Sequence, residues 1–125
     1  LSQQSLFALS SLSYHDYEGV ALNPDEKVRL VADLGNTNFM ILRNHGLLTC
    51  ADTIADAFLF MYLLEVSCQI QLKAQSSGQE LIPIPSQILA GIRAQADQVT
   101  RSAGGGLAWP GILRKLDRVN PGYDQ

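Results

Sequence analysis

The sequence predicts an α/β fold organised around residues 39–72. Two short apolar runs, Phe39–Leu42 and Gly46–Thr49, are bounded by turn residues, which is typical of strands buried in a sheet. A polar bend, Asn44-His45-Gly46, separates the two runs, and a long apolar helix follows them. Glycine tolerates backbone conformations that other residues resist, so Gly46 allows a tight turn in which His45 points away from the core.

The long helix is predicted to start at a cap provided by Asp52 or Thr53 and to end before Gly78, a length of about 25 residues. Between residues 57 and 66 nearly every position is apolar, so more than one face should be covered and the helix should be buried. Glu65 is the exception. Its carboxylate would reach a polar neighbour or a wet edge of the helix, or, if buried, act as an acid or base.

The residues before residue 39 predict smaller elements. Residues 2–13 have helix-compatible spacing of apolar side chains, and residues 14–19, YHDYEG, form a polar and aromatic loop of the kind that often carries function. Residues 20–22 are predicted as a brief edge strand. The Asn-Pro-Asp-Glu run from Asn23 predicts the start of a second helix, and Gly35 predicts its end.

Residues 82–86 predict an extended connector, because each proline disfavours the helical conformation in the residue before it. An amphipathic helix capped by Ser86 is then predicted to fade at the triple glycine 104–106. This glycine run lacks the Gly-Lys-Ser/Thr ending of a phosphate loop. A last helix is predicted from Pro110, with a short, solvated basic face made by Arg114, Lys115 and Arg118.

The composition limits the classes of partner. At 125 residues the chain is long enough for one domain. Charged residues make up 17% of it, against a usual figure of about 25%, which suggests that another subunit or further sequence covers part of the surface. The net charge is −3 and there is no basic block, so nucleic acid is not expected as a partner.

A membrane is not expected as a partner either. The longest apolar stretch, residues 57–64, is far shorter than the roughly 20 residues that a membrane helix needs. The first residues lack the pattern of a leader, so we expect a cytoplasmic location. The first residue is Leu1 rather than methionine, which indicates a chain that was trimmed or is part of a longer protein.

The two cysteines, Cys50 and Cys68, form no Cys-x-x-Cys pair, which excludes a disulfide framework and a zinc knuckle. Each is expected to be a small buried hydrophobic residue.

His45 is the first candidate for chemistry, and three interpretations are open. It could be a turn histidine hydrogen-bonded to the backbone, a general base, or a metal ligand. A catalytic zinc needs about three protein ligands with one position left open, and His15, the only other histidine, lies in a separate loop. On these residues alone the site is incomplete. Ser-His-Asp chemistry is not supported, because no serine lies in a nucleophile-elbow setting.

The sequence around this bend resembles a known family. Residues 41–49, ILRNHGLLT, are followed by a helix with Ala57-Phe58, then Leu64-Glu65 and the run Cys68-Gln69-Ile70-Gln71. This combination resembles the class II aldolase and adducin family. In effect residues 1–125 resemble the C-terminal half of that family's domain and form a single partial domain.

The resemblance implies a three-layer α/β/α fold around a mostly antiparallel central sheet. It also implies assembly as a homo-oligomer, usually a tetramer, with active sites between subunits. In the aldolases of the family the histidine of the bend is one of three zinc ligands, a position that His45 matches. The other two belong to an upstream His-x-His motif, which this chain does not contain.

The resemblance also implies a role for Tyr17 as the catalytic proton donor, acting in a neighbouring subunit. The acid-base glutamate and the phosphate-binding loops of the family lie upstream, so Glu65 is not assigned to catalysis. The implied function is that of a zinc- or other divalent-metal-dependent class II aldolase, a carbon–carbon lyase that acts on a hydroxy-carbonyl or sugar-phosphate-like substrate, incomplete in this chain. The alternative is a non-catalytic, adducin-like protein-interaction module.

Overall fold

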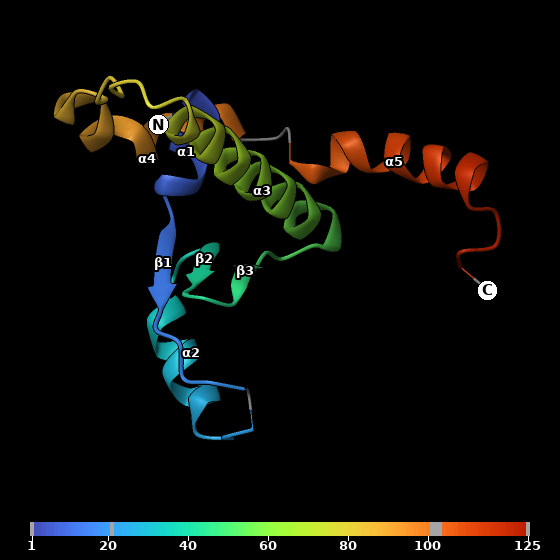
Figure 1. Ribbon diagram of the computed structural model, residues 1–125. Helices are drawn as coiled ribbons and strands as arrows, with labels where there is room; N and C mark the ends of the chain where they lie inside the picture. The colour runs from blue at the N-terminus through green and yellow to red at the C-terminus, as the bar shows by residue number, and fades with distance from the viewer. Residues whose placement is uncertain (1, 21, 101–103, 125) are drawn as a thin grey trace.

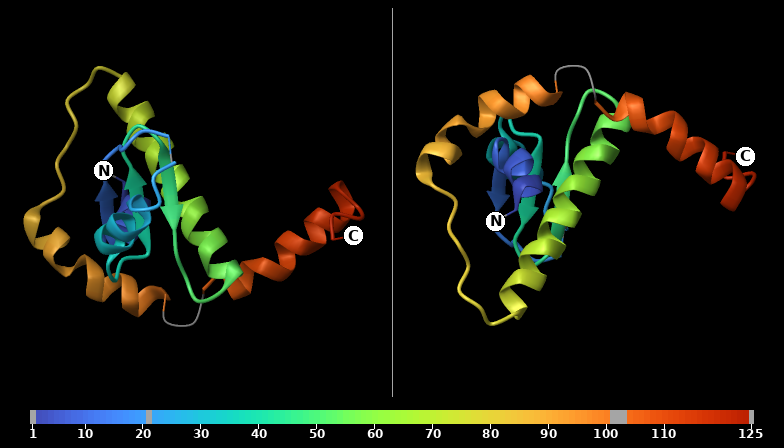
Figure 2. Two further views of the ribbon diagram at one scale, coloured as in Figure 1. Left: turned by 90° about the horizontal axis from the view of Figure 1, so that it is seen from below. Right: turned by 90° about the horizontal axis from the view of Figure 1, so that it is seen from above.

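The computed structural model describes residues 2–20, 22–100 and 104–124 (Figure 1). Helices and strands are mixed in the first half of the chain, and every helix or strand of the described residues after residue 50 is a helix (Figure 2). In chain order the elements are α1 (Gln3–Leu9), β1 (Leu12–His15), α2 (Glu26–Leu34), β2 (Phe39–Leu42), β3 (Gly46–Thr49), α3 (Ile54–Ser76), α4 (Ser86–Thr100) and α5 (Gly105–Val119).

The sheet of the described residues has three strands in the order β1-β2-β3. β1 runs parallel to β2, with Leu12 opposite Phe39, and β2 pairs antiparallel with β3, with Leu42 opposite Gly46. The predicted bounds of β2 and β3 are therefore confirmed. The expected mostly antiparallel arrangement is not what these three strands form, because one pair is parallel and one is antiparallel.

β1 was not predicted, since residues 12–15 were divided between a helix and a loop. Its four residues, Leu-Ser-Tyr-His, contain no apolar run, and pairing with β2 creates the strand. The Ser11 carbonyl accepts from the backbone N–H groups of Asn38 and Phe39, at 3.2 and 3.1 Å, and starts the pairing. The edge strand predicted at 20–22 is absent at Val20 and Leu22, and residue 21 lies outside the described residues.

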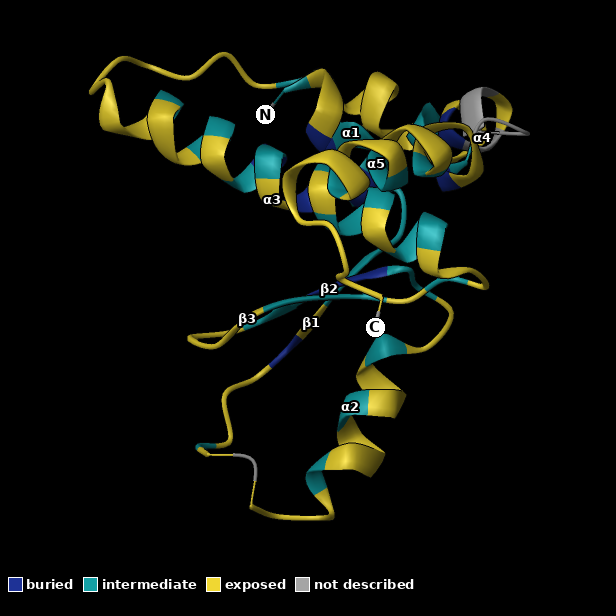
Figure 3. Ribbon diagram, turned by 90° about the vertical axis from the view of Figure 1, so that its right-hand side faces the viewer, coloured by how far each residue is buried: buried dark blue, intermediate teal, exposed yellow. Residues whose placement is uncertain are grey.

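Helices lie on both faces of the sheet, which gives three layers. Figure 3 shows α1 and α3 on one side of the strands and α2 on the other. The core between the sheet and α1 and α3 contains Ala8, Phe39 and Leu64. Met40 follows Phe39 and is fully buried, and because successive strand residues point to opposite faces, it faces the side of α2.

The helix α3 starts at the predicted cap, where the Thr53 hydroxyl accepts from the backbone N–H of Asp56 at 3.1 Å. It packs on α1, α5 and β3. The prediction that the helix is buried is wrong for this chain, because only Leu64 and Ser67 are buried along its length. Glu65 lies on its exposed side, where its carboxylate accepts from the Gln69 amide at 2.9 Å.

By length and composition α3 could also cross a membrane, and it is the single helix with that property in the described part of the chain. In this fold only some of the apolar residues of α3 are covered. Part of them pack on the sheet and on two helices, and others, such as Ile54 and Leu72, are exposed.

The loops also differ in part from the prediction. α2 starts at Glu26, later than predicted, because the Asn23 side chain accepts from the backbone of Asp25 at 3.0 Å and so caps a preceding turn. Gly35 ends α2 as predicted, with φ of 52°. Cys50 is exposed rather than buried, since it leaves β3 for the turn before α3. Cys68 is half-buried, and this burial raises the pKa of its thiol.

The triple glycine begins a helix instead of ending one. α4 begins with Ser86 itself, one residue before the start that a Ser86 cap predicts, and α5 starts at Gly105, so Pro110 lies inside α5. The N–H of Gly105 donates to the Asp56 carboxylate at 2.7 Å. Hydrogen bonds to the Asp56 carboxylate from the Thr53 hydroxyl and from this N–H lower the pKa of Asp56. A Cβ atom on Gly105 would lie 1.9 Å from the carbonyl oxygen of Ala55, so only glycine allows the two helix ends to meet.

We therefore expect Gly105→Ala to weaken the contact between α3 and α5 and to destabilise the protein by about 1–3 kcal/mol. Gly106→Ala is the matched control, because its Cβ would meet open space and alanine favours the helix. Urea unfolding of both variants measures the difference. Equal unfolding midpoints for the two variants would contradict the close approach of Gly105 to the Ala55 carbonyl.

Candidate functional site

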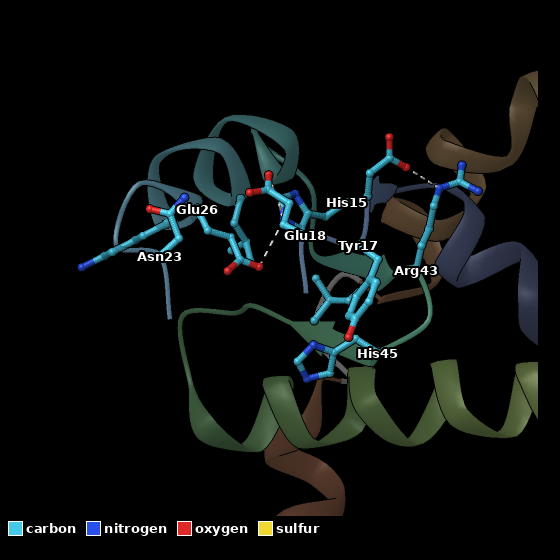
Figure 4. A pocket seen from close by; sticks show the side chains of 11 residues that line it. His15, Tyr17, Glu18, Asn23, Glu26, Arg43 and His45 are labelled. Atoms are coloured by element: carbon cyan, nitrogen blue, oxygen red, sulfur yellow. Dashed lines mark ion pairs between the residues drawn. The ribbon is translucent and has the colours of Figure 1, made fainter. Parts of the chain in front are cut away.

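A cavity of about 310 Å³ lies where three segments meet: the loop after β1, the helix α2, and the bend between β2 and β3. The side chains that line it are drawn in Figure 4. Both residues singled out from the sequence, Tyr17 and His45, are among them. The structure therefore brings together two residues that are 28 positions apart in the chain.

The bend presents His45 at this cavity. Leu42 pairs with Gly46, which leaves residues 43–45 as the turn. The positive φ of the turn, 56°, falls on Asn44 and not on Gly46, so the expected role of Gly46 is wrong. The backbone N–H of His45 donates to the Leu42 carbonyl at 3.0 Å, while the residue as a whole is exposed. The imidazole is thus directed away from the core, as predicted.

Tyr17 reaches the cavity from the loop after β1. The residue is 52% exposed, and in Figure 4 its phenol group points toward the His45 imidazole. The resemblance implied that this tyrosine acts in a neighbouring subunit. In the structure Tyr17 and His45 of the same chain line one cavity.

Sequence reasoning missed a charge cluster centred on a buried histidine in one wall of the cavity. His15 is only 4% exposed, and its Nδ1–H donates to the Asp33 carboxylate at 2.7 Å. Its Nε2 lies 3.7 Å from a Glu26 oxygen and 3.9 Å from a Glu18 oxygen. Among the described residues this buried nitrogen has no hydrogen-bond partner.

A sequence signal for this cluster exists. Glu26 and Asp33 are seven residues apart, so on a helix they share one face two turns apart. A histidine in a preceding polar loop is a natural partner for two such carboxylates. What the sequence does not give is the strand β1, which places His15 next to α2.

The charges around His15 shift the pKa of its ring upward. The main cause is the hydrogen bond to Asp33, burial opposes it, and the negative charges of Asp33, Glu18 and Glu26 add to the rise. Glu18 is held in turn by Arg29, whose Nε donates to one carboxylate oxygen at 2.7 Å and whose Nη2 donates to the other. This pairing lowers the pKa of Glu18.

These shifts predict how stability depends on pH. Because the pKa of His15 is raised by folding above its ordinary value of about 6.5, its charged ring stabilises the fold below that value. The contribution is lost as the pH rises through the folded-state pKa. We expect His15→Asn to lower the melting temperature most below about pH 6.5 and less at higher pH. A melting-temperature difference that is constant with pH would contradict a charged His15.

Arg43 connects the bend to the loop that carries Tyr17. Its backbone N–H donates to the His15 carbonyl at 2.9 Å, and its Nε lies 2.9 Å from an Asp16 carboxylate oxygen. The guanidinium also lies over the Tyr14 ring, 5.1 Å from its centroid. The segments that carry His45 and Tyr17 are therefore joined through one arginine.

The metal that the resemblance implies can be tested against these residues. In the described part of the chain no three His, Cys, Asp or Glu side chains converge in a way that could hold a metal ion. His15 is committed to Asp33 through Nδ1. His45 is exposed, lines the cavity and has the chemistry of a ligand, so the residues that the structure describes could supply one ligand but not a complete set.

Comparison with known proteins identifies the family. Residues 2–72 match the sequence model of the Class II Aldolase and Adducin N-terminal domain. This match covers more than half of the chain, and the chain therefore belongs to the class II aldolase and adducin family.

Individual relatives agree with this assignment. A Pseudomonas aeruginosa protein named "Putative aldolase class 2 protein" is 65% identical over an alignment 128 residues long, which covers 100% of this chain and 49% of the relative. Rat alpha-adducin is 35% identical over 72 residues, or 57% of this chain and 10% of the adducin.

Solved structures show the same fold. A crystal structure of an aldolase II superfamily protein from Pseudomonas syringae has a TM-score of 0.89 and 40% identity, covering 100% of this chain and 50% of that chain. L-fuculose 1-phosphate aldolase from Glaciozyma antarctica has a TM-score of 0.60 and 29% identity, covering 75% of this chain and 34% of the aldolase. The chain thus spans about half the length of the aldolase-type relatives that it matches along its whole length.

Proposed function

We propose that this chain forms one wall of the active site of a class II aldolase, a metal-dependent lyase that cleaves a carbon–carbon bond in a small hydroxy-carbonyl or sugar-phosphate substrate. The observation that carries the proposal is that Tyr17 and His45 line one cavity. An imidazole suited to a metal and a phenol suited to proton transfer are two of the groups that such a reaction needs.

In this proposal His45 supplies one nitrogen ligand to zinc or another divalent ion, and the remaining ligands come from outside these residues. The bound metal would stabilise the negative charge that develops on the substrate when the bond breaks. Tyr17 would act as the proton donor. Its exposed phenol and its direction toward His45 support this role.

We further propose that the chain is part of a longer domain in which additional strands complete a mostly antiparallel sheet, and that the domain assembles as a homo-oligomer. The support is the exposed apolar surface of α3, including Ile54, Phe58 and Leu72, which a complete fold or a partner subunit would cover.

Tyr17→Phe tests the proposed proton donor. We expect the full protein to lose about 10²–10⁴-fold in kcat for retro-aldol cleavage, because the phenol proton is removed while the ring remains. The assay uses L-fuculose 1-phosphate and related hydroxy-carbonyl compounds. Tyr14→Phe is the control, since Tyr14 lies nearby, against Arg43, but does not line this cavity. Unchanged turnover in Tyr17→Phe would remove this residue from the mechanism.

A mixing experiment decides which subunit Tyr17 serves. We place both residues in the site of one chain, so hybrids of His45→Ala and Tyr17→Phe should stay inactive after subunit exchange. Recovered activity would instead show that the tyrosine acts on a neighbouring subunit's site, as the resemblance implies.

The second candidate function is that of an adducin-like interaction module without a metal. Two observations favour it: the identity with alpha-adducin, and the lack of three converging metal ligands in the described residues. Metal analysis of the full protein separates the two functions. About one bound divalent ion per subunit, lost together with turnover on chelation, supports the lyase, and a metal-free folded protein supports the interaction module.

A further inference from the structure

Four successive residues of the cavity wall, residues 15–18, have an uneven pattern of contacts. We call them the HDYE segment. The charged side chains of His15, Asp16 and Glu18 each form an ion pair with another element. Tyr17 is the one uncharged member, and its side chain is half exposed and extends into the cavity. The segment is therefore held on both sides of the proposed proton donor.

On the N-terminal side the contact is made by a buried side chain, His15. The Nδ1–H of His15 donates to Asp33 of α2, which fixes the ring. The groups that face Nε2 are Glu26 of α2 and Glu18 of the segment itself, both carboxylates. A neutral ring would turn a lone pair toward two negative charges, whereas a proton on Nε2 gives the ring a positive charge that attracts both carboxylates. The arrangement therefore favours the charged ring.

The contact on the C-terminal side has the planar two-point geometry typical of arginine and a carboxylate. Arg29 donates from Nε and from Nη2 to the two oxygens of Glu18. Arg29 and Asp33 both belong to α2, so a single helix holds the segment on either side of Tyr17. The remaining pair, Asp16 with Arg43, is highly exposed and should contribute less to the order of the segment.

We propose that His15 and Glu18 are positioning residues, which through their ion pairs with Asp33 and Arg29 of α2 hold the HDYE segment so that the Tyr17 phenol is directed toward His45. This inference deepens the proposed function and rests on it for the catalytic meaning of Tyr17. The position of the ring itself does not depend on the reaction, so it can be measured separately.

The test uses the full protein labelled with 3-fluorotyrosine, in which the ¹⁹F resonance of Tyr17 is assigned by its loss in Tyr17→Phe. In His15→Asn and Asp33→Asn we expect this resonance to shift and sharpen as the ring becomes mobile. In the wild type it should also move with pH as His15 loses its proton, and this movement should be absent in His15→Asn. Asp52→Asn is the control, because Asp52 is an exposed carboxylate that does not line this cavity.

Turnover provides the second readout. We expect His15→Asn to lower kcat about 10–100-fold with little change in KM, because a misplaced acid reduces the rate more than binding. Arg29→Lys, which keeps the charge but loses the two-point geometry, should give a smaller loss than Arg29→Ala.

The outcomes separate the two proposals. An unchanged Tyr17 resonance in both His15→Asn and Asp33→Asn would overturn the positioning role, whatever the turnover shows. A shifted resonance with Tyr17→Phe still fully active would support the positioning role and overturn the proposed proton donor. Circular dichroism of each variant, matching the wild type, ensures that the signals come from folded protein.

Discussion

Replacing His45 by alanine is expected to lower the metal content of the full protein and its retro-aldol turnover together. Loss of one ligand from a set of about three weakens metal binding. The bound metal stabilises the charge of the transition state by several kcal/mol, and this stabilisation is lost with it. We therefore expect a loss in kcat/KM on the order of a thousandfold. Metal analysis by mass spectrometry and a steady-state assay on the same sample measure both effects.

The control for this variant is Asn44→Gly, which changes the same bend but keeps the positive φ that the turn requires. It should retain both metal and turnover. A His45→Ala protein with wild-type metal content would contradict the ligand role, and a metal-free wild type would favour the interaction module.

The largest effect on stability is expected at Met40. This side chain is fully buried, so Met40→Ala should leave a cavity and destabilise the fold by about 2–5 kcal/mol. Met61→Ala is the matched control, because the same side chain is removed from a half-buried position on α3. Urea unfolding of both variants measures the difference. Equal losses would contradict the central position of β2.

Much of the fold could be predicted from local patterns. The bounds of β2 and β3 follow from apolar runs between turn residues, and the start of α3 follows from a threonine cap. β1 could not be predicted, because its residues form a strand only by pairing with β2. The start of α5 at Gly105 likewise depends on contact with α3, which three glycines in a row do not reveal.

The candidate site likewise has residues that could be predicted from the sequence and contacts that could not. Tyr17 and His45 could be selected from the sequence, since each depends on its own loop and on the family resemblance. Their shared cavity depends on the position of β1 beside β2. The ion pair of His15 with Asp33 joins residues 18 positions apart, and periodicity shows only that Glu26 and Asp33 share a helix face.

The burial of α3 was overestimated for a physical reason. An apolar helix predicts that something covers it, but the pattern does not say which segment does so. In this chain the sheet, α1 and α5 cover part of α3, and Phe58 and Tyr62 remain exposed. The low proportion of charged residues agrees with a surface that further sequence or a partner subunit covers.

The most direct test of the central claim is anomalous X-ray diffraction from crystals of the full protein, measured on both sides of the zinc absorption edge. When the bound metal is zinc, the proposed function predicts a zinc peak at this cavity, about 2.0–2.1 Å from an imidazole nitrogen of His45. A zinc peak coordinated entirely by other residues, with the His45 ring free, would contradict it.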